Sequence, residues 1–165
     1  MEVVAELAER GGERLRKAKE RATVTEVRIG GRKLALAVPQ TYMNESGQAA
    51  APLVRRFGVT MDRVVVVHDE LDLPVGKVKV KVGGGLAGHN GLKSLKSHLH
   101  SDEFLRVRVG VGRPPGRMAG ADYVLRRPGK AERAELDLAV AEAVDIVLCI
   151  LGEGVDLAMN RYNGA

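Results

Sequence analysis

The stretch RVVVVHDELDLPVGKVKVKVGGGLAGHNGLKSL, residues 63–95, decides the fold of this chain. It opens with a valine run, Val64 to Val67, and an apolar run without polar alternation predicts a strand buried on both faces of a sheet. His68, Asp69 and Glu70 follow directly. Open α/β sheets place their functional sites at the carboxyl ends of strands. These three polar residues therefore mark a candidate site.

The second half of this stretch combines a strand with a loop that structure alone rarely requires. Residues 77–82 alternate lysine and valine, so we expect a strand with lysine on one face and valine on the other. The loop from 83 to 91 is rich in glycine, which lets backbone approach a ligand closely. It ends in a histidine and an amide, His89 and Asn90, which are further candidates for a site.

The composition indicates a reduced protein with one domain over its 165 residues. Cys149 is the only cysteine, which excludes an internal disulfide and a thiolate metal cluster. The N-terminus lacks the order of a signal peptide and no apolar run reaches membrane-spanning length, so we expect a cytoplasmic protein. The net charge of +5 hints at a polyanionic partner, whereas 3% aromatic residues argue against a broad base-stacking surface.

The remaining patterns predict one α/β domain, residues 1–165, with helices on both faces of a mixed sheet. Gly30-Gly31 indicates a tight hairpin, Ser46 a helix N-cap and Gly58 a helix end. The expected helices are 2–10, 46–57, 92–99, 131–151 and 155–160, the expected strands are 23–29, 32–38, 64–67, 77–82, 104–112 and 122–125, and 113–117 is expected to be a loop.

The polar cluster after the valine run allows two roles for Asp69. We expect no metal there, because neighbouring strand residues point to opposite faces and no third ligand is spaced to complete a site. Asp69 fits an orienter of a catalytic histidine, since a carboxylate fixes the tautomer of an imidazole. It fits a loop-capping residue equally well, and the residues alone leave both roles open.

The glycine loop has an alternative interpretation as a nucleotide-binding loop. Gly83, Gly85 and Gly88 formally match G-x-G-x-x-G. The preceding strand carries lysines, however, and no strand ending in an acidic residue follows about 20 residues later, as dinucleotide binding requires. A nucleotide-binding protein using residues 83–91 is therefore only the alternative, and we expect no cofactor.

Two strands carry basic residues at alternate positions, which are Lys77, Lys79 and Lys81 on one and Arg106 and Arg108 on the other. The lysines alone could also serve to keep an exposed edge strand from pairing with a strand of another molecule. If the two strands are neighbours, their basic rows merge into one face suited to phosphates.

Three ordered motifs resemble those of bacterial peptidyl-tRNA hydrolase: PQTYMNESG at 39–47, HDELD at 68–72 and GGGLAGHNGLK at 83–93. RVRVGVGRP at 106–114 and the C-terminal helix also fit, so the resemblance covers essentially the whole chain. This family cleaves the ester that joins a peptide to the 3′ ribose of tRNA, recycling tRNA from aborted translation. The resemblance implies an ester hydrolase with peptidyl-tRNA as its partner, no cofactor, no membrane and no obligate protein partner, hence a monomer.

The resemblance also implies roles for individual residues. A carboxylate would hold the catalytic histidine in its basic form, and two amides could donate hydrogen bonds to the developing oxyanion. Basic residues would clamp tRNA phosphates, and a histidine would belong to a mobile gate beside the site. The implied catalytic residues are Asp69, Asn44 and Asn90, and the implied substrate- and tRNA-binding residues are Tyr42, Asn44, Asn90, His89, Lys79, Lys81 and Arg108.

The family's general base lies in a part of the pattern that this sequence lacks. Family members have an apolar strand, a Gly-Asn-Pro-Gly loop and an Arg-His-Asn segment that carries the base, all upstream of the position of Met1. His68 and His89 match other family positions, so the catalytic histidine is not present here. We expect a start assigned too far downstream. The competing interpretation is a real short form that keeps RNA binding and has lost hydrolysis.

Overall fold

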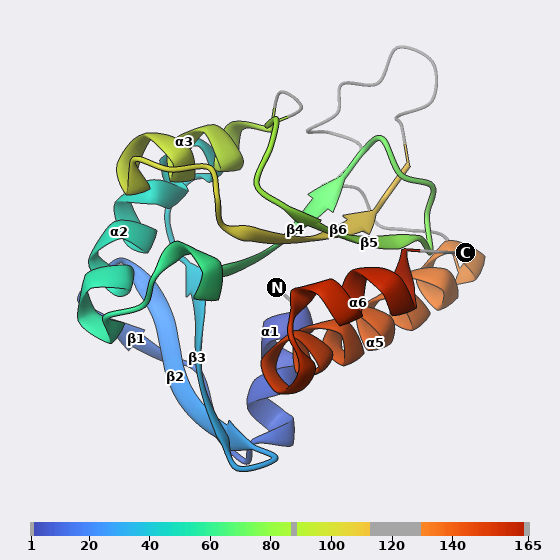
Figure 1. The fold of residues 1–165 in the computed structure, drawn as a ribbon, viewed down its shortest axis with the longest axis horizontal. Coiled ribbons are helices and arrows are strands. Elements are labelled where there is room, and N and C mark those ends of the chain that lie inside the picture. Colours follow the sequence, from blue (N-terminus) through green and yellow to red (C-terminus); the bar gives the residue numbers. More distant parts are fainter. Residues whose placement is uncertain (1, 87–88, 113–129, 164–165) are drawn as a thin grey trace. The chain divides into compact units, whose positions relative to one another are not determined.

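The computed structural model describes residues 2–86, 89–112 and 130–163 (Figure 1). It divides into two compact units. The first unit comprises residues 1–65 and 82–105, and the second comprises 66–81 and 106–165. Both contain strands and helices, which confirms the α/β class. In the described residues the strands form two three-stranded sheets, a division that the sequence patterns did not indicate. That the chain is a single domain stays a prediction.

The first sheet is an antiparallel meander whose hairpin was predicted. It consists of β1 (Arg16–Ala18), β2 (Ala22–Ile29) and β3 (Arg32–Pro39). Gly30 and Gly31 join β2 to β3 with φ of 58° and 77°. Positive φ at both central positions is the geometry of the two-residue hairpin turn that matches strand twist, and glycine adopts it without strain.

Helices cover both faces of this sheet, as expected. On one face, Ala22 and Val24 of β2 pack in a buried cluster with Ala49 and Leu53 of α2 (Ser46–Phe57). On the other face, α1 (Glu2–Arg10) buries Val3, Leu7 and Ala8, and a Cβ at Gly11, just past its end, would collide with the side chain of Val27. Val24 and Val27 differ in parity along β2, so they project from opposite faces.

Two details of α2 bear on the candidate site. The helix ends at Gly58 with φ of 63°, as predicted, but Ser46 is not its N-cap. A 3₁₀ turn, η1 (Met43–Glu45), runs directly into α2, so Ser46 is already helical and its hydroxyl donates to the Met43 carbonyl at 2.8 Å. A second 3₁₀ turn, η2 (Met61–Arg63), follows α2.

The second sheet is mixed and has the strand order β4-β6-β5, with β4 at Val65–Glu70, β5 at Val78–Val82 and β6 at Leu105–Gly110. Its hydrogen bonds advance in the same direction along β4 and β6, which are parallel, and in opposite directions along β5 and β6, which are antiparallel. These bonds are Leu105 N–H to Val64 O (2.8 Å), Val111 N–H to Glu70 O (3.1 Å), Gly110 N–H to Lys77 O (2.8 Å) and Gly83 N–H to Phe104 O (3.2 Å).

Burial in this sheet differs from the expectation at two places. The valines of β4 are only half-buried, whereas His68 and Glu70 are buried, so the prediction of a valine strand buried on both faces is wrong. The strand is an outer one in the described sheet and continues to Glu70. Arg106, on the central strand β6, is 1% exposed, so it cannot belong to a solvent-facing basic row.

The described part of the second unit also contains the helices α5 (Lys130–Glu153) and α6 (Val155–Tyr162). Just beyond α6, the side-chain amide of Asn163 makes two hydrogen bonds with the backbone of Val80 on β5. Within the ranges described, no helix combines the length and apolar character needed to cross a membrane. The predicted loop at 113–117 and strand at 122–125 lie outside the described residues.

Candidate active-site residues

Tyr42 and Asn44 lie at the 3₁₀ turn η1 in the first unit. Tyr42 is the residue before the turn and is 80% exposed, and Asn44 within the turn is also exposed. The position of the turn is fixed by a buried hydrogen bond in the helical turn that follows it, where the N–H of Gly47 donates to Ser94 Oγ at 2.8 Å. An exposed phenol and an exposed amide thus lie side by side in sequence on an anchored turn.

His89 and Asn90 lie at the start of helix α3 (Asn90–Leu99), also in the first unit. His89 is the N-cap of this helix, and its Nδ1 accepts a hydrogen bond from the Leu92 N–H at 3.1 Å. Asn90 is the first helical residue and its side chain is exposed. The sequence predicted a helix from residue 92 and did not predict the histidine cap, for which Ser, Thr, Asp or Asn is the usual signal.

The turn η1 and the start of α3 are in contact. A Cβ at Gly91 would lie 2.7 Å from Met43 Sδ and 2.9 Å from His89 Cε1, so the Met43 side chain lies directly against the start of α3. The structure thus brings together the segments that carry four of the predicted residues, which are Tyr42, Asn44, His89 and Asn90.

Asp69 lies in the second unit, on β4, and is half-buried. His68 and Glu70 flank it and, by the alternation of a strand, project from the opposite face of the sheet. The ring of His68 is buried, and its Nδ1 lies 2.9 Å from the backbone oxygen of Asp69. The His68 ring therefore has a backbone partner, and it lies on the opposite face of the sheet from the Asp69 carboxylate.

Glu70 and Arg108 form an ion pair between the parallel strands β4 and β6. Arg108 Nε donates to Glu70 Oε1 at 3.0 Å, and the Asp72 N–H donates to Glu70 Oε2 at 3.3 Å. Burial by itself raises the pKa of the Glu70 carboxyl, but the Asp72 bond, the Arg108 guanidinium and the charge of His68 outweigh burial, and the pKa lies below its ordinary value. Glu70 is thus an anion at neutral pH.

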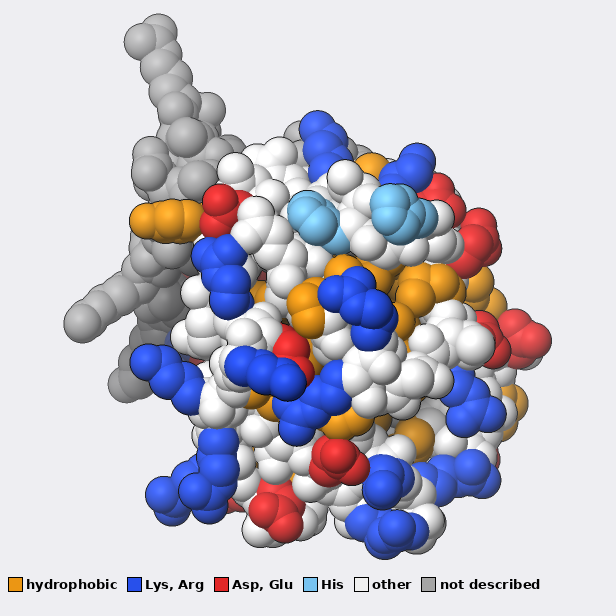
Figure 2. All heavy atoms as spheres, turned by 90° about the vertical axis from the view of Figure 1, so that its left-hand side faces the viewer, with side chains coloured by type: hydrophobic (Ala, Val, Ile, Leu, Met, Phe, Trp, Pro, Cys, Tyr) orange, Lys and Arg blue, Asp and Glu red, His pale blue; other side chains and the backbone are white. Residues whose placement is uncertain are grey.

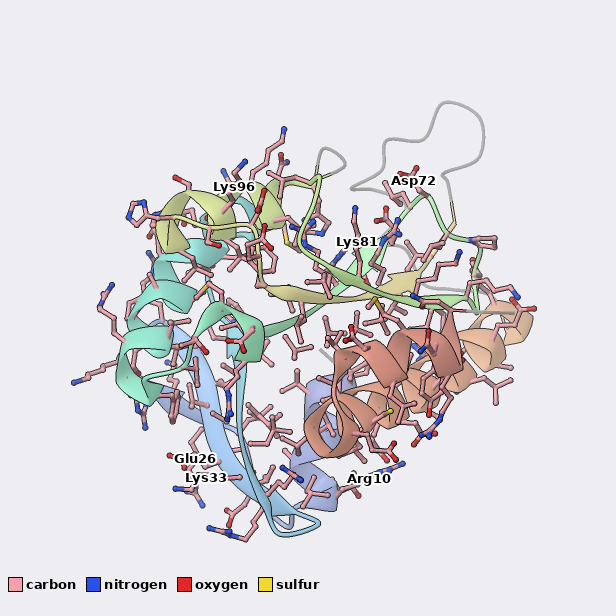
Figure 3. All side chains as sticks on the ribbon, viewed as in Figure 1. Arg10, Glu26, Lys33, Asp72, Lys81 and Lys96 are labelled. Carbon is pink, nitrogen blue, oxygen red and sulfur yellow. The ribbon has the colours of Figure 1, made fainter. Side chains whose placement is uncertain are left out.

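Lys79 and Lys81 lie on β5 with their side chains on the face opposite to the buried valines, as predicted. The bond from Gly110 N–H to Lys77 O sets the antiparallel register, which places Lys79 opposite Arg108. Side chains of directly opposed residues share a face, so Lys79, Lys81 and Arg108 form one basic row on this sheet (Lys81 is labelled in Figure 3). The expected merging of the two rows holds for Arg108 and fails for the buried Arg106.

Basic side chains also occupy surface of the first unit. Figure 2 shows Lys and Arg side chains spread over one face of the molecule, together with histidine. The exposed basic residues of α2 and α3 are Arg55, Arg56, Lys93 and Lys96. Among the residues described, no group of three or more His, Cys, Asp or Glu side chains is arranged to hold a metal ion.

The chain is similar to known proteins along its whole length. A family model described as peptidyl-tRNA hydrolase matches residues 1–165. The chain is 49% identical to a peptidyl-tRNA hydrolase of Pseudarthrobacter chlorophenolicus, over 99% of this chain and 84% of that protein. It is 48% identical to a peptidyl-tRNA hydrolase of Frankia alni, over 98% of this chain and 82% of that protein.

The fold of the chain is also similar to a solved structure of a peptidyl-tRNA hydrolase. The crystal structure of peptidyl-tRNA hydrolase from Acinetobacter baumannii is similar with a TM-score of 0.91 and 32% identity, covering 98% of this chain and 83% of that one. These findings favour the hydrolase over the nucleotide-binding alternative. The chain belongs to the peptidyl-tRNA hydrolase family, a family of ester hydrolases.

Proposed function

We propose that this chain cleaves the ester of peptidyl-tRNA, with the amides of Asn44 and Asn90 acting on the ester end of the substrate. The contact between η1 and the start of α3 supports this proposal most directly, because it gathers two exposed amides in one region of the first unit. Ester hydrolysis develops negative charge on the carbonyl oxygen, and amide N–H groups stabilise that charge as fixed donors. Tyr42 and His89 contact the adjoining parts of the peptide and the tRNA end.

The basic row of Lys79, Lys81 and Arg108 binds tRNA phosphates in this proposal. Phosphate contacts give sequence-independent affinity, which suits an enzyme that accepts many tRNAs. In this proposal Asp69 is the orienter of the family's histidine base, so Asp69→Asn lowers the rate of hydrolysis only in a chain that carries that histidine. The protein acts as a monomer in the cytoplasm without a membrane or an obligate protein partner.

The kinetics of Asn44→Ala and Asn90→Ala test the amide roles. Removal of one oxyanion donor typically costs about 10²–10³-fold in kcat. We expect each variant to show a loss of this order on a defined peptidyl-tRNA, with thermal unfolding unchanged. Asn160→Ala is the matched control, since it removes an exposed amide from α6 and should keep the wild-type rate. Wild-type kcat in both Asn44→Ala and Asn90→Ala would refute the proposal.

A further inference from the structure

We propose that Glu70 is a positioning residue for Arg108, holding its guanidinium by Nε so that the other N–H groups face a tRNA phosphate. This inference rests on the proposed function, because it assumes that Arg108 contacts tRNA. It adds a residue that the sequence placed only in a polar cluster. The role assigned to Glu70 is orientation of a neighbour and includes no contact with the substrate.

The carboxylate of Glu70 is held on both of its oxygens. Oε1 accepts from Arg108 Nε at 3.0 Å, and Oε2 accepts from the Asp72 N–H at 3.3 Å. The two strands that carry this pair are hydrogen-bonded neighbours, with Val111 N–H donating to Glu70 O. The side chain of Glu70 is 10% exposed, so its rotamer is restricted by packing as well as by bonding. A fixed acceptor of this kind orients the planar group that bonds to it.

The guanidinium of Arg108 retains donors after this bond is made. Its side chain is 23% exposed, and the bond to Glu70 uses one of the five N–H donors that arginine presents in a rigid fork. Lys79, opposite Arg108 in the register of β5 and β6, is exposed on the same face. A phosphate that reaches the basic row therefore meets an oriented fork beside a mobile ammonium group.

A purely structural role for Glu70 is the competing explanation. A partly buried arginine without a counter-charge is costly, so Glu70 could serve only to neutralise Arg108. The two explanations differ in sign for tRNA binding. Removing a negative charge near a basic row strengthens attraction of a polyanion. Loss of orientation weakens binding, because the fork no longer faces the phosphate.

The positioning role and the purely structural role are separated by measuring the affinity of the full chain for tRNA at a series of salt concentrations. We expect Glu70→Gln to weaken binding and to lower the slope of log affinity against log salt by about one unit, as Arg108→Ala does. The double variant should bind no more weakly than Arg108→Ala alone. Glu153→Gln is the matched control, because it removes the carboxylate of another Glu–Arg ion pair. Glu153 pairs with Arg161, and both side chains are half exposed. The salt slope of this variant should equal that of the wild type.

Arg108→Lys keeps the test decisive if Glu70→Gln fails to fold. Lysine retains the positive charge and an ion pair with Glu70, but its single ammonium cannot hold Glu70 and present a fork to a phosphate. We expect this variant to fold and to bind tRNA as weakly as Arg108→Ala. Wild-type affinity in Arg108→Lys, or tighter binding in Glu70→Gln beside a weakened Arg108→Ala, would overturn the positioning role alone. Wild-type affinity and slope in Arg108→Ala would instead overturn the proposed phosphate contact, and the inference with it.

Discussion

His89 caps the helix that Asn90 begins, because its Nδ1 accepts the Leu92 N–H at 3.1 Å. A ring nitrogen that accepts a hydrogen bond carries no proton, so the neutral imidazole holds its proton on Nε2 and presents a donor there. The cap thus fixes the tautomer of His89. In this tautomer the lone pair of Nδ1 is engaged in the cap, so the ring is not arranged to serve as the base that activates water.

Replacement of His89 should separate its two roles. We expect His89→Ala to lower the free energy of unfolding by about 1 kcal/mol, the usual cost of losing an N-cap, measured by denaturant titration. His89→Asn should retain most of the stability, since an asparagine side chain is a good cap. If the Nε2 donor contributes to substrate binding, His89→Asn will still raise KM. Equal stability of the Ala and wild-type proteins would contradict the cap.

Gly47 is expected to be intolerant of a side chain. Its added Cβ would collide with the backbone oxygen of Ser94 in α3, and overpacking against backbone typically costs 1–3 kcal/mol, so Gly47→Ala should lower the free energy of unfolding by roughly that amount. Gly152→Ala is the control within helix α5, where a Cβ meets nothing within 4 Å. It should stabilise by about 0.5–1 kcal/mol, because alanine is the better helix former. Two variants with the same change in free energy would rule out the close contact of α2 with α3.

Lys81 should contribute to tRNA affinity through the attraction of its ammonium group to a tRNA phosphate. We expect Lys81→Ala to weaken tRNA binding and to lower the salt slope by about one unit. Lys33→Ala makes the same charge change at an exposed lysine of β3 that pairs with Glu26 at 3.6 Å. That control should leave the slope within error of wild type. A slope that falls equally in both variants would indicate a general charge effect in place of a defined contact.

The Glu70 carboxylate should make stability depend on acidity. Because its folded-state pKa is lowered, the stabilisation is fully present above its unfolded-state pKa of about 4.3 and is lost as pH falls through the folded-state pKa. We therefore expect wild type to exceed Glu70→Gln in free energy of unfolding at neutral pH, with the difference shrinking below about pH 4.3. Urea titrations of both proteins from pH 7 to pH 3 measure this. A difference independent of pH would mean that ionisation of Glu70 contributes nothing.

Local signals in the sequence predicted most of the elements. Gly30-Gly31 predicted the hairpin, because its turn needs positive φ at both positions and glycine adopts that conformation easily. Gly58 predicted the end of α2 for the same reason. The lysine and valine alternation of β5 gave the correct faces. Each of these features depends on residues within a few positions of one another, so their physical cause is visible in the sequence itself.

The remaining features depend on partners far apart in the chain. Glu70 and Arg108 are 38 residues apart, and nothing local to either indicates the other. Arg106 is buried on the central strand β6, and the central place of that strand is defined only by the pairing of three strands that are far apart in the sequence. Tyr42, Asn44, His89 and Asn90 were assigned roles through family motifs, and their grouping became visible only through the contact of η1 with α3.

The two hydrogen bonds from Asn163 to Val80 have a consequence for association between molecules. Val80 lies on β5, an outer strand in the described part of its sheet, and its N–H and C=O are the groups that an outer strand offers to a foreign one. The amide of Asn163 accepts from that N–H at 2.9 Å and donates to that C=O at 2.7 Å, as a paired strand would. One side chain thus closes the middle of the edge against β-sheet aggregation.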